Sequence, residues 1–250
     1  MKAGVLYLFL LVGVLAWAGC ETESPQSSNS TDPDAPTTDE QAEAPADATD
    51  PPDDAINVLV LGNSIAAGYG LDPDDAFPNV LGDKAEDAGF PLRVDNASES
   101  GLTTAGGLSR LDWVLREPVD IFILELGGND GLRGIDPTTT QDNLEAMIET
   151  VTDHSPDVQI LLGGMEAPPN MGLEYTSEFR GIYPDVAEQH DHVTLIPFIL
   201  EDVAGNPDKN QPDGIHPTAE GQRIVAQNVW DHLKPMLEEA DPETASATSP

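Results

Sequence analysis

The chain has 250 residues, with 46 acidic residues against 10 lysines and arginines, and its formal net charge is −36. The two ends do not account for this charge: 11 acidic residues lie in residues 21–55 and four follow Leu237, which leaves 31 acidic against nine basic residues between them, a net charge of about −22. A surface this negative repels phosphate groups, which argues against nucleic acid or an anionic membrane surface as a partner.

The balance of charged residue types also bears on the habitat of the protein. Only four lysines occur in the chain, and a low-lysine, high-acid composition favours adaptation to high salt, where screening relieves the repulsion between negative charges. An ordinary acidic secreted protein is the alternative. Stability measured against salt concentration distinguishes the two.

Residues 1–19 have the layout of a secretory signal peptide. Lys2 is followed by an uncharged run over residues 5–17, which is too short for a membrane-spanning helix of roughly 20 apolar residues. The sequence Trp17-Ala18-Gly19-Cys20 resembles a bacterial lipobox, although Trp17 stands where an aliphatic residue is usual. We therefore expect a lipid-modified Cys20 that anchors the protein to a bacterial membrane outside the cytoplasm. An ordinary signal peptide with an incidental cysteine is the alternative.

Residues 20–55 are expected to form a disordered acidic spacer. After Cys20, which is the only cysteine, the segment is rich in Pro, Ser, Thr, Ala and acidic residues and has no basic or aromatic residue, so it cannot bury enough apolar surface to fold. Such a chain is solvated and would hold a domain away from the membrane. Residues 238–250 are expected to form a second disordered acidic tail. The remaining residues, 56–237, are long enough for one domain with a full core.

Within residues 56–237, short apolar runs alternate with amphipathic segments, as in a mostly parallel sheet covered by helices. Asp136-Pro137 supplies a cap and a first-turn proline for one helix, and the last helix is expected to begin near Pro217. The strands are expected at residues 56–61, 92–94, 119–126, 158–162 and 193–198. The apolar faces of the two helices are Leu144, Met147, Ile148 and Val151, and Ala226, Val229, Trp230, Leu233 and Leu237. The predicted fold is α/β, a three-layer α/β/α sandwich with a five-stranded, mostly parallel sheet.

Ser64 directly follows the first expected strand, in the stretch Gly62-Asn63-Ser64-Ile65-Ala66. Ligands of open α/β sheets bind at the carboxyl ends of the strands, so a serine held there can present its hydroxyl as a nucleophile. Ala66 occupies the position where the α/β-hydrolase elbow needs glycine, and no lysine follows the glycines as a phosphate-binding loop requires. Taken alone, a serine in such a turn is more often a turn residue or a helix cap.

Asp213 and His216 lie three residues apart, just before the last helix. At this spacing the carboxylate can orient the imidazole and stabilise the imidazolium that forms when the histidine takes a serine proton. Two other interpretations remain open: Asp213 caps the helix while His216 is a surface residue, or the pair binds a metal, for which further ligands at suitable spacing are lacking. The other histidines, which lie in polar segments, are interpreted as solvated: His154, His190, His192 and His232.

Acyl transfer also needs hydrogen-bond donors for the oxyanion that develops on the substrate. Asn129 follows the most apolar expected strand after two glycines, which allow the backbone to approach a ligand closely. The loop containing Gly101, after the second strand, can supply a backbone N–H, and Ser64 can supply its own. A turn explains Asn129 or Gly101 separately, but it does not explain why all these sites occur at strand ends.

These stretches resemble the sequence blocks of the SGNH, or GDSL-type, hydrolase family over about residues 56–237. The likeness is closest to the bacterial arylesterase and lysophospholipase-like acyl-thioesterase branch, on residues 62–70, 125–134 and 213–218. The resemblance implies a flavodoxin-like fold with Ser64 as nucleophile, His216 as base and Asp213 as its orienting partner. It also implies an oxyanion hole formed by Gly101, Asn129 and the Ser64 amide.

Two further features, one segment and one residue, bear on this resemblance. Residues 164–172 are similar to a substrate-side loop of the same branch. Asn63 is a departure, because the family normally has Asp before the serine. That Asp is not a member of the triad, so the change bears on loop packing and pH behaviour more than on activity.

From this pattern we predict an extracytoplasmic serine esterase that cleaves carboxylic esters through an acyl-enzyme, without metal or cofactor. Short to medium acyl esters, aryl esters, lysophospholipids and acyl thioesters are the expected small-molecule substrates. A carbohydrate O-deacetylase with the same residues is one alternative. A surface-tethered binding protein without catalysis is another, against which the intact set of site residues argues. We expect no nucleic-acid partner and a monomer.

Overall fold

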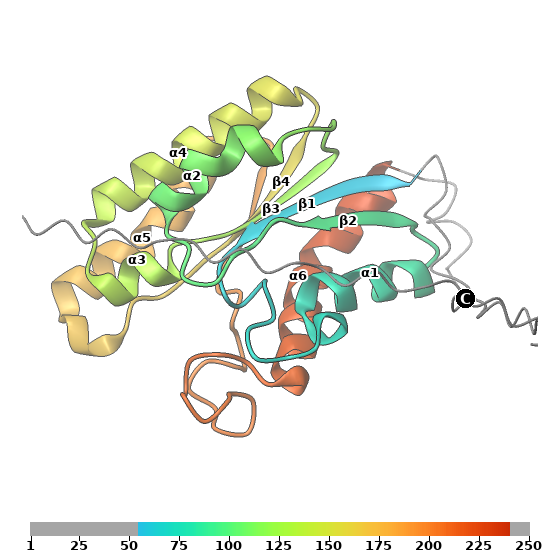
Figure 1. The fold of residues 1–250 in the computed structure, drawn as a ribbon. Helices are drawn as coiled ribbons and strands as arrows, with labels where there is room; N and C mark the ends of the chain where they lie inside the picture. The colour runs from blue at the N-terminus through green and yellow to red at the C-terminus, as the bar shows by residue number, and fades with distance from the viewer. Residues whose placement is uncertain (1–54, 241–250) are drawn as a thin grey trace, which may run out of the picture. The chain divides into compact units, whose positions relative to one another are not determined.

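The computed structural model describes residues 55–240, which form a five-stranded sheet between two layers of helices (Figure 1). The sheet order is β2-β1-β3-β4-β5, and every neighbouring pair of strands is parallel. The strands are β1 (Ile56–Gly62), β2 (Leu92–Asn96), β3 (Ile121–Glu125), β4 (Gln159–Gly163) and β5 (Val193–Ile196). The predicted α/β sandwich with five strands is therefore confirmed. The predicted signal peptide, nearly all of the predicted spacer and residues 241–250 of the predicted tail lie outside the described residues. Residues 238–240 of that tail are helical, contrary to the prediction.

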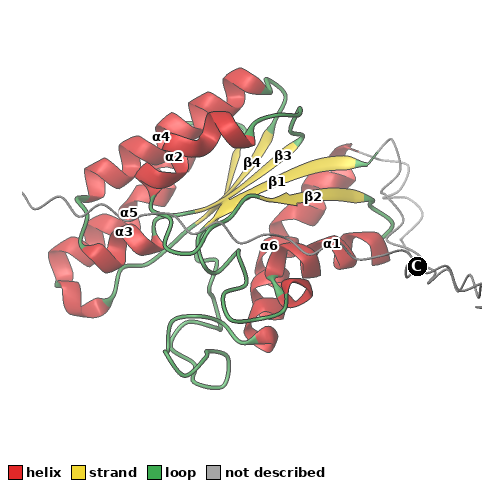
Figure 2. Cartoon of the chain, in the orientation of Figure 1, coloured by secondary structure: helices red, strands yellow, loops and turns green. Residues whose placement is uncertain are grey.

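Helices cover both faces of the sheet (Figure 2). α1 and α6 pack together on one face, while α2, α4 and α5 cover the other. The α-helices are α1 (Phe77–Asp87), α2 (Thr104–Val114), α3 (Gly128–Arg133), α4 (Pro137–His154), α5 (Leu173–Glu188) and α6 (Ala219–Ala240), and the short 3-10 helices are η1 (Pro73–Asp75) and η2 (Pro169–Met171). This arrangement leaves the loops at the carboxyl ends of the strands uncovered, and the predicted site residues lie on these loops.

The element boundaries follow local chemistry. β5 ends at Ile196, two residues before the predicted end, because Pro197 has no N–H for the ladder. α4 begins as predicted, with Pro137 in its first turn and the Asp136 carboxylate accepting the Thr138 N–H at 2.9 Å. α6 begins at Ala219 and continues to Ala240, past the predicted domain end at Leu237, and an ion pair between Lys234 and Glu238 at 3.4 Å spans its last turns.

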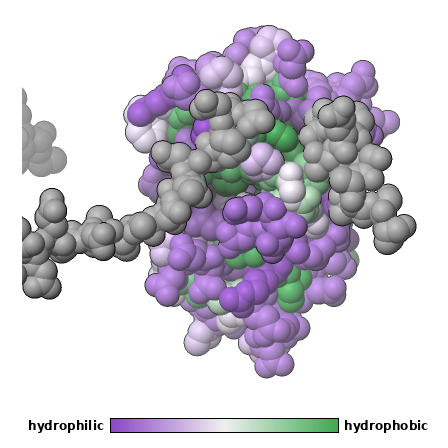
Figure 3. Space-filling model, turned by 90° about the vertical axis from the view of Figure 1, so that its right-hand side faces the viewer, coloured by the Kyte–Doolittle hydropathy of each residue, from purple (hydrophilic) through white to green (hydrophobic). Residues whose placement is uncertain are grey.

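The core consists of the strands and the inward faces of the helices. All five residues of β3 are buried, as are the predicted apolar faces of α4 and α6. On the face of the molecule in Figure 3, hydrophilic residues dominate the surface and apolar atoms appear only in patches between them. Among residues 55–240, no helix combines the length and the apolar character that crossing a bilayer requires.

Candidate active site

Three loops meet at the carboxyl end of the sheet. One follows β1 and carries Ser64, one follows β3 and leads into α3, whose first turn carries Asn129, and the third precedes α6 and carries Asp213 and His216. Because parallel strands all end at the same edge of a sheet, residues separated by more than 150 positions become neighbours there. The loops are drawn in green in Figure 2.

Ser64, His216 and Asp213 form one continuous chain of hydrogen bonds. The His216 Nε2 atom lies 2.9 Å from the Ser64 Oγ atom, and the His216 Nδ1 atom lies 2.7 Å from an Asp213 carboxylate oxygen. With Nδ1 protonated, the imidazole donates to the carboxylate and its Nε2 lone pair faces the serine hydroxyl. This is the geometry in which a histidine can remove the serine proton.

Asp213 is oriented by its own loop. One carboxylate oxygen accepts the backbone N–H groups of Ile215 at 2.9 Å and His216 at 3.0 Å, which leaves the other oxygen for the imidazole. The imidazole contact, followed by these two backbone donors, lowers the pKa of Asp213 to about 2. The side chain that caps α6 is that of Thr218, which accepts the Gly221 N–H at 3.2 Å, so Asp213 is not the helix cap.

Metal binding by this pair finds no support in the described residues. In that part of the chain no group of three or more His, Cys, Asp or Glu side chains is close enough to hold a metal ion. The other four histidines are not bonded to this pair. They were predicted to be solvated, but three of them are not fully exposed. His190, His192 and His232 are half-buried, and only His154 is exposed. The His192 ring lies 2.9 Å from the Thr152 hydroxyl of α4, and the His232 ring 2.9 Å from the Asn228 carbonyl of α6.

Asn63 and Glu125 form a buried hydrogen-bonded pair that holds the backbone next to Ser64. The Asn63 amide donates to one Glu125 carboxyl oxygen at 2.7 Å, and the backbone N–H groups of Asn63 and Ala66 donate to the other at 3.0 and 3.3 Å. Burial raises the pKa of Glu125 to about 8, against the opposing effect of these three donors. Sequence analysis placed Glu125 only in a strand; an acidic residue inside an apolar run is the signal that could have singled it out.

Asn129 connects the two loops expected to carry oxyanion donors. It lies in the first turn of α3, which Gly127 enters with φ +112°, a conformation that favours glycine, and a side chain at this position would collide with the Tyr183 hydroxyl. One Asn129 amide N–H donates to the Leu102 carbonyl at 3.0 Å, which holds it against the loop of Gly101. The structure thus joins Asn129 to the Gly101 loop, and the second amide N–H has no partner among the described residues.

Buried polar contacts fix this donor loop to the domain. The carboxylate of Asp130, fully buried, accepts the Thr104 hydroxyl at 2.6 Å and the Thr104 N–H at 3.0 Å. The Asn143 amide donates to the same hydroxyl at 3.0 Å. These contacts tie α2, α3 and α4 together next to Asn129, and sequence analysis did not anticipate them.

The histidine side of the site has an aromatic neighbour that sequence analysis also missed. The Tyr69 ring lies 4.4 Å from the His216 ring, centroid to centroid. The Gln211 amide donates to the Tyr69 carbonyl at 2.7 Å, and the Gln222 amide, from α6, donates to the Ile65 carbonyl at 2.8 Å. The loop before α6 and α6 itself therefore hold the serine loop from the other side.

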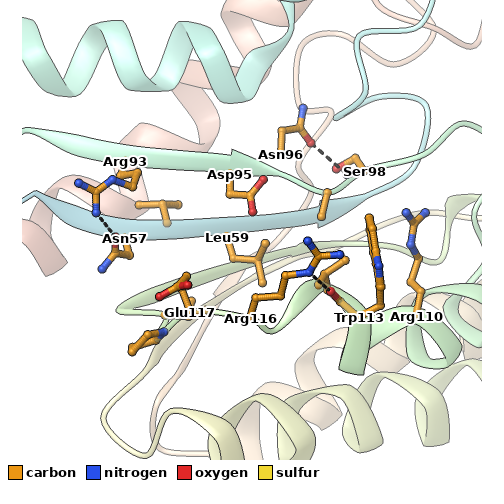
Figure 4. Close-up of a pocket in the computed structure, with 15 residues that line it drawn as sticks. Asn57, Leu59, Arg93, Asp95, Asn96, Ser98, Arg110, Trp113, Arg116 and Glu117 are labelled. Atoms are coloured by element: carbon orange, nitrogen blue, oxygen red, sulfur yellow. Dashed lines mark hydrogen bonds between the residues drawn. The ribbon is translucent and has the colours of Figure 1, made fainter. Parts of the chain in front are cut away.

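A groove of about 650 Å³ lies elsewhere, between the β1–β2 edge of the sheet and α2 (Figure 4). Apolar residues of β1 and α2 form its floor, and three arginines line it with an exposed tryptophan: Arg93, Arg110, Arg116 and Trp113. Asp95 and Glu117 also line it. None of the predicted site residues borders this groove, so the cavity and the hydrogen-bonded serine are separate features.

Comparison with known proteins matches this chain to one family. Residues 60–224 match the model of the GDSL-like Lipase/Acylhydrolase family. The chain is 42% identical to esterase TesA of Pseudomonas aeruginosa over 184 residues, which cover 73% of this chain and 90% of that protein. It is 38% identical to thioesterase 1/protease 1/lysophospholipase L1 of Escherichia coli K12, over 73% of this chain and 86% of that protein. A crystal structure of TesA superposes with a TM-score of 0.68 at 42% identity, over 72% of this chain and 99% of that one.

Proposed function

The chain belongs to the GDSL-like lipase/acylhydrolase family and is a hydrolase of ester bonds, and on this premise we propose that Ser64 is its nucleophile, with His216 as general base and Asp213 as the group that orients the base. The observation that carries the proposal is the unbroken chain of hydrogen bonds at 2.9 and 2.7 Å. A turn serine does not require an imidazole partner, and a carboxylate on the second ring nitrogen selects the tautomer that can accept the serine proton.

The reaction follows from this geometry. The Ser64 Oγ atom attacks the carbonyl carbon of the ester while His216 Nε2 takes the hydroxyl proton, and the carbonyl oxygen becomes an oxyanion. The amides of Ser64 and Gly101 and the free N–H of Asn129 stabilise that oxyanion. The imidazolium returns its proton to the leaving alcohol, which leaves an acyl-enzyme. A water molecule, activated by His216, then releases the acid and restores Ser64.

The surroundings of the triad favour uncharged substrates. Two of the five large hydrophobic side chains exposed among the described residues, Tyr69 and Ile215, are about half exposed beside His216, and a third, Leu132, follows Asn129 on α3. These apolar surfaces suit acyl or aryl groups, whereas the acidic domain repels anionic substrates. We infer that neutral or zwitterionic esters with short to medium acyl groups are the substrates, with thioesters as a further class that the name of the Escherichia coli relative suggests.

We propose an extracytoplasmic location from Cys20 and the acidic residues that follow it. A lipid on Cys20 and the acidic residues that follow would display the domain outside the cytoplasm, at the end of a spacer. Metabolic labelling with an alkyne fatty acid tests this proposal: the wild-type chain should be labelled and Cys20→Ser should not.

Trapping the acyl-enzyme tests the mechanism. Mixing the protein with a p-nitrophenyl ester should release a burst of nitrophenol close to one equivalent, and rapid acid quenching followed by intact-mass measurement should find one acyl group, on the peptide that contains Ser64. Ser64→Ala should give neither signal. An acyl-length panel that includes an acetylated sugar distinguishes the esterase from a carbohydrate deacetylase. Unchanged turnover by Ser64→Ala would overturn the proposal.

A further inference from the structure

Glu125 is an unusual residue for its position. It is the last residue of β3, it is fully buried, and it stands opposite Gly62 in the register between β1 and β3. The absence of a side chain at Gly62 makes room for it, because a Cβ atom there would press against a Glu125 oxygen. A carboxyl group buried in a core strand is costly and needs partners. All of the partners that the structure gives it belong to the loop of the serine.

The direction of each hydrogen bond in this cluster is fixed. The Asn63 side-chain oxygen accepts the Ile65 N–H at 2.9 Å, so the amide nitrogen must be the group that faces Glu125. Glu125 thus receives three N–H donors, two on one oxygen and one on the other. The Asn63 oxygen also lies 3.4 Å from the Ser64 hydroxyl. Glu125 and Asn63 together hold the backbone on both sides of Ser64.

We propose that Glu125 and Asn63 act as a positioning pair that fixes the Ser64 hydroxyl for attack, and that asparagine at position 63 lets this pair work without a shared proton. The inference rests on the proposed role of Ser64. Neither residue touches the substrate. Both act through the loop, and an error of about 1 Å in the position of a reacting group can lower a rate by 10²-fold.

The choice of asparagine follows from charge. A carboxylate in place of the Asn63 amide would lie 2.7 Å from the Glu125 oxygen, and two carboxylates at that distance must share a proton. Loss of that proton at alkaline pH would drive the two groups apart. With the Asn63 amide, ionisation of Glu125 adds to the hydrogen bonds of the loop.

The other titratable groups around Glu125 already have partners. The Tyr183 hydroxyl, on α5, donates to the Leu126 carbonyl at 3.0 Å, and the Asp130 carboxylate, on α3, accepts from Thr104. His216 hydrogen-bonds to Ser64 and packs its ring against Tyr69, and the structure gives it no hydrogen bond to Glu125 or Asn63. The Glu125 carboxyl group is therefore the titrating group that meets the Asn63 amide directly.

Four proteins test the pair, each as the full chain: wild type, Glu125→Gln, Asn63→Asp and the double variant. Glu125→Gln keeps an oxygen for the backbone N–H groups but turns a new amide toward the Asn63 amide, so two donors face each other. Asn63→Asp sets two carboxyl groups against each other. The double variant restores a donor–acceptor pair with its direction reversed, so it should recover function that both single variants lose.

The measurements are kcat and KM for p-nitrophenyl butyrate at pH 6.5 and pH 9, with thermal unfolding of each protein. We expect Glu125→Gln to lose roughly 10- to 100-fold in kcat at both pH values, with KM changed by less than about threefold. Asn63→Asp should lose a few-fold at pH 6.5 and at least about 10-fold more at pH 9. The kcat of the double variant should return to within about threefold of the wild-type value at both pH values.

Each result bears on the proposal. Losses that add in the double variant, or a kcat unchanged in Glu125→Gln, would overturn it. If Glu125→Gln does not fold, the pH dependence of Asn63→Asp decides alone, and a constant ratio to wild type between pH 6.5 and 9 would overturn it. Ser64→Ala is measured beside these proteins. Activity retained in that variant would reject the role of Ser64, which is a different failure from that of the positioning pair.

Discussion

The carboxyl end of the sheet and the groove beside α2 both gather charged side chains, but they hold them in different ways. At the carboxyl end, Ser64 bonds to His216 from a different loop, and His216 bonds to Asp213 within its own loop. In the groove, Arg93 donates to the Asn57 side-chain oxygen and Arg116 to the Trp113 carbonyl, both at 3.0 Å, and neither is paired with a carboxylate within residues 55–240.

The difference separates a set of residues linked by hydrogen bonds from a hollow in the surface. The groove has volume and charge, but Arg116 lies 4.5 Å from the centre of the Trp113 ring and Arg93 bonds to a neutral oxygen. Arg110 pairs with the exposed carboxylate of Glu99, which does not line the groove. The carboxyl end has groups whose protons can move along a defined path. Linked donors and acceptors, rather than cavity size, are therefore the basis on which we propose the carboxyl end of the sheet as the place of chemistry.

Removing either end of the proton path should have the largest effect. Ser64→Ala and His216→Ala are each expected to lower kcat by about 10⁴-fold or more, because the members of a triad act as a unit. Hydrolysis of a p-nitrophenyl ester measures the loss, and circular dichroism checks that the domain stays folded. Loss of folding together with activity would make the result uninformative for Ser64, and the acyl-enzyme trap would then decide.

Asp213→Asn should cost about 10³- to 10⁴-fold in kcat, since the amide no longer selects the tautomer of His216. The lowered pKa of Asp213, about 2, also leads to a prediction about pH dependence.

A carboxyl group with a depressed pKa contributes stability at pH values above its ordinary pKa of 3.8, and this stability is lost as the pH falls toward 2. The pH profile of kcat/KM should therefore contain no limb from Asp213 above about pH 4, and a wild-type limb between pH 4 and 5 that Asp213→Asn removes would contradict this.

Asn129→Ala separates an oxyanion donor from a turn residue. A donor acts mainly in the transition state, so kcat should fall by roughly 10² to 10³ while KM changes little. A variant that loses thermal stability but keeps its kcat would instead assign Asn129 to holding the Leu102 loop. Steady-state kinetics and a thermal unfolding scan of the same preparation give both readings.

Salt tests the acidic surface as a whole. With about 22 uncompensated negative charges on residues 56–237, added NaCl should raise the unfolding midpoint, because the Debye length falls from ~30 Å at 0.01 M to ~3 Å at 1 M. A shortened chain that starts near Asp53 removes most of the acidic spacer from the measurement. If the unfolding midpoint stays constant or falls between about 0.05 M and 2 M NaCl, the protein is an ordinary acidic esterase without adaptation to high salt.

The smallest effect is expected in the groove. Arg116→Gln should leave kcat/KM within about twofold of wild type and change stability by no more than about 0.5 kcal/mol, as for a surface residue without a buried partner. It serves as the matched control for the active-site variants. A large fall in activity would show that the groove and the carboxyl end are coupled and would break the contrast between them.

Much of this arrangement could be predicted from local sequence. Apolar runs marked the five strands, and Asp136-Pro137 marked the start of α4, because these signals depend on residues close together in the chain. Ser64, Asn129, Asp213 and His216 stood out because each lies directly beside a strand or a helix end, and the structure links Ser64, His216 and Asp213 as that reading required.

The contacts that could not be predicted are those between distant segments. Glu125 and Asn63 are 62 residues apart, and nothing near Glu125 in sequence reveals that its partners lie in the serine loop. The same holds for Asp130 with Thr104 and for Tyr69 over His216. A sequence shows that a polar residue lies in an apolar run, but its partner is decided by tertiary packing.

The serine loop is held by α6, the last helix of the domain, through Gln222, which donates to the Ile65 carbonyl and accepts the Phe77 N–H. His216 also comes from this final part of the chain, 152 residues after Ser64. On the proposed roles of Ser64 and His216, a nascent chain carries the nucleophile long before it carries the base or the glutamine that holds the serine loop. Such a chain would have no esterase activity until α6 has been synthesised and has packed against the serine loop.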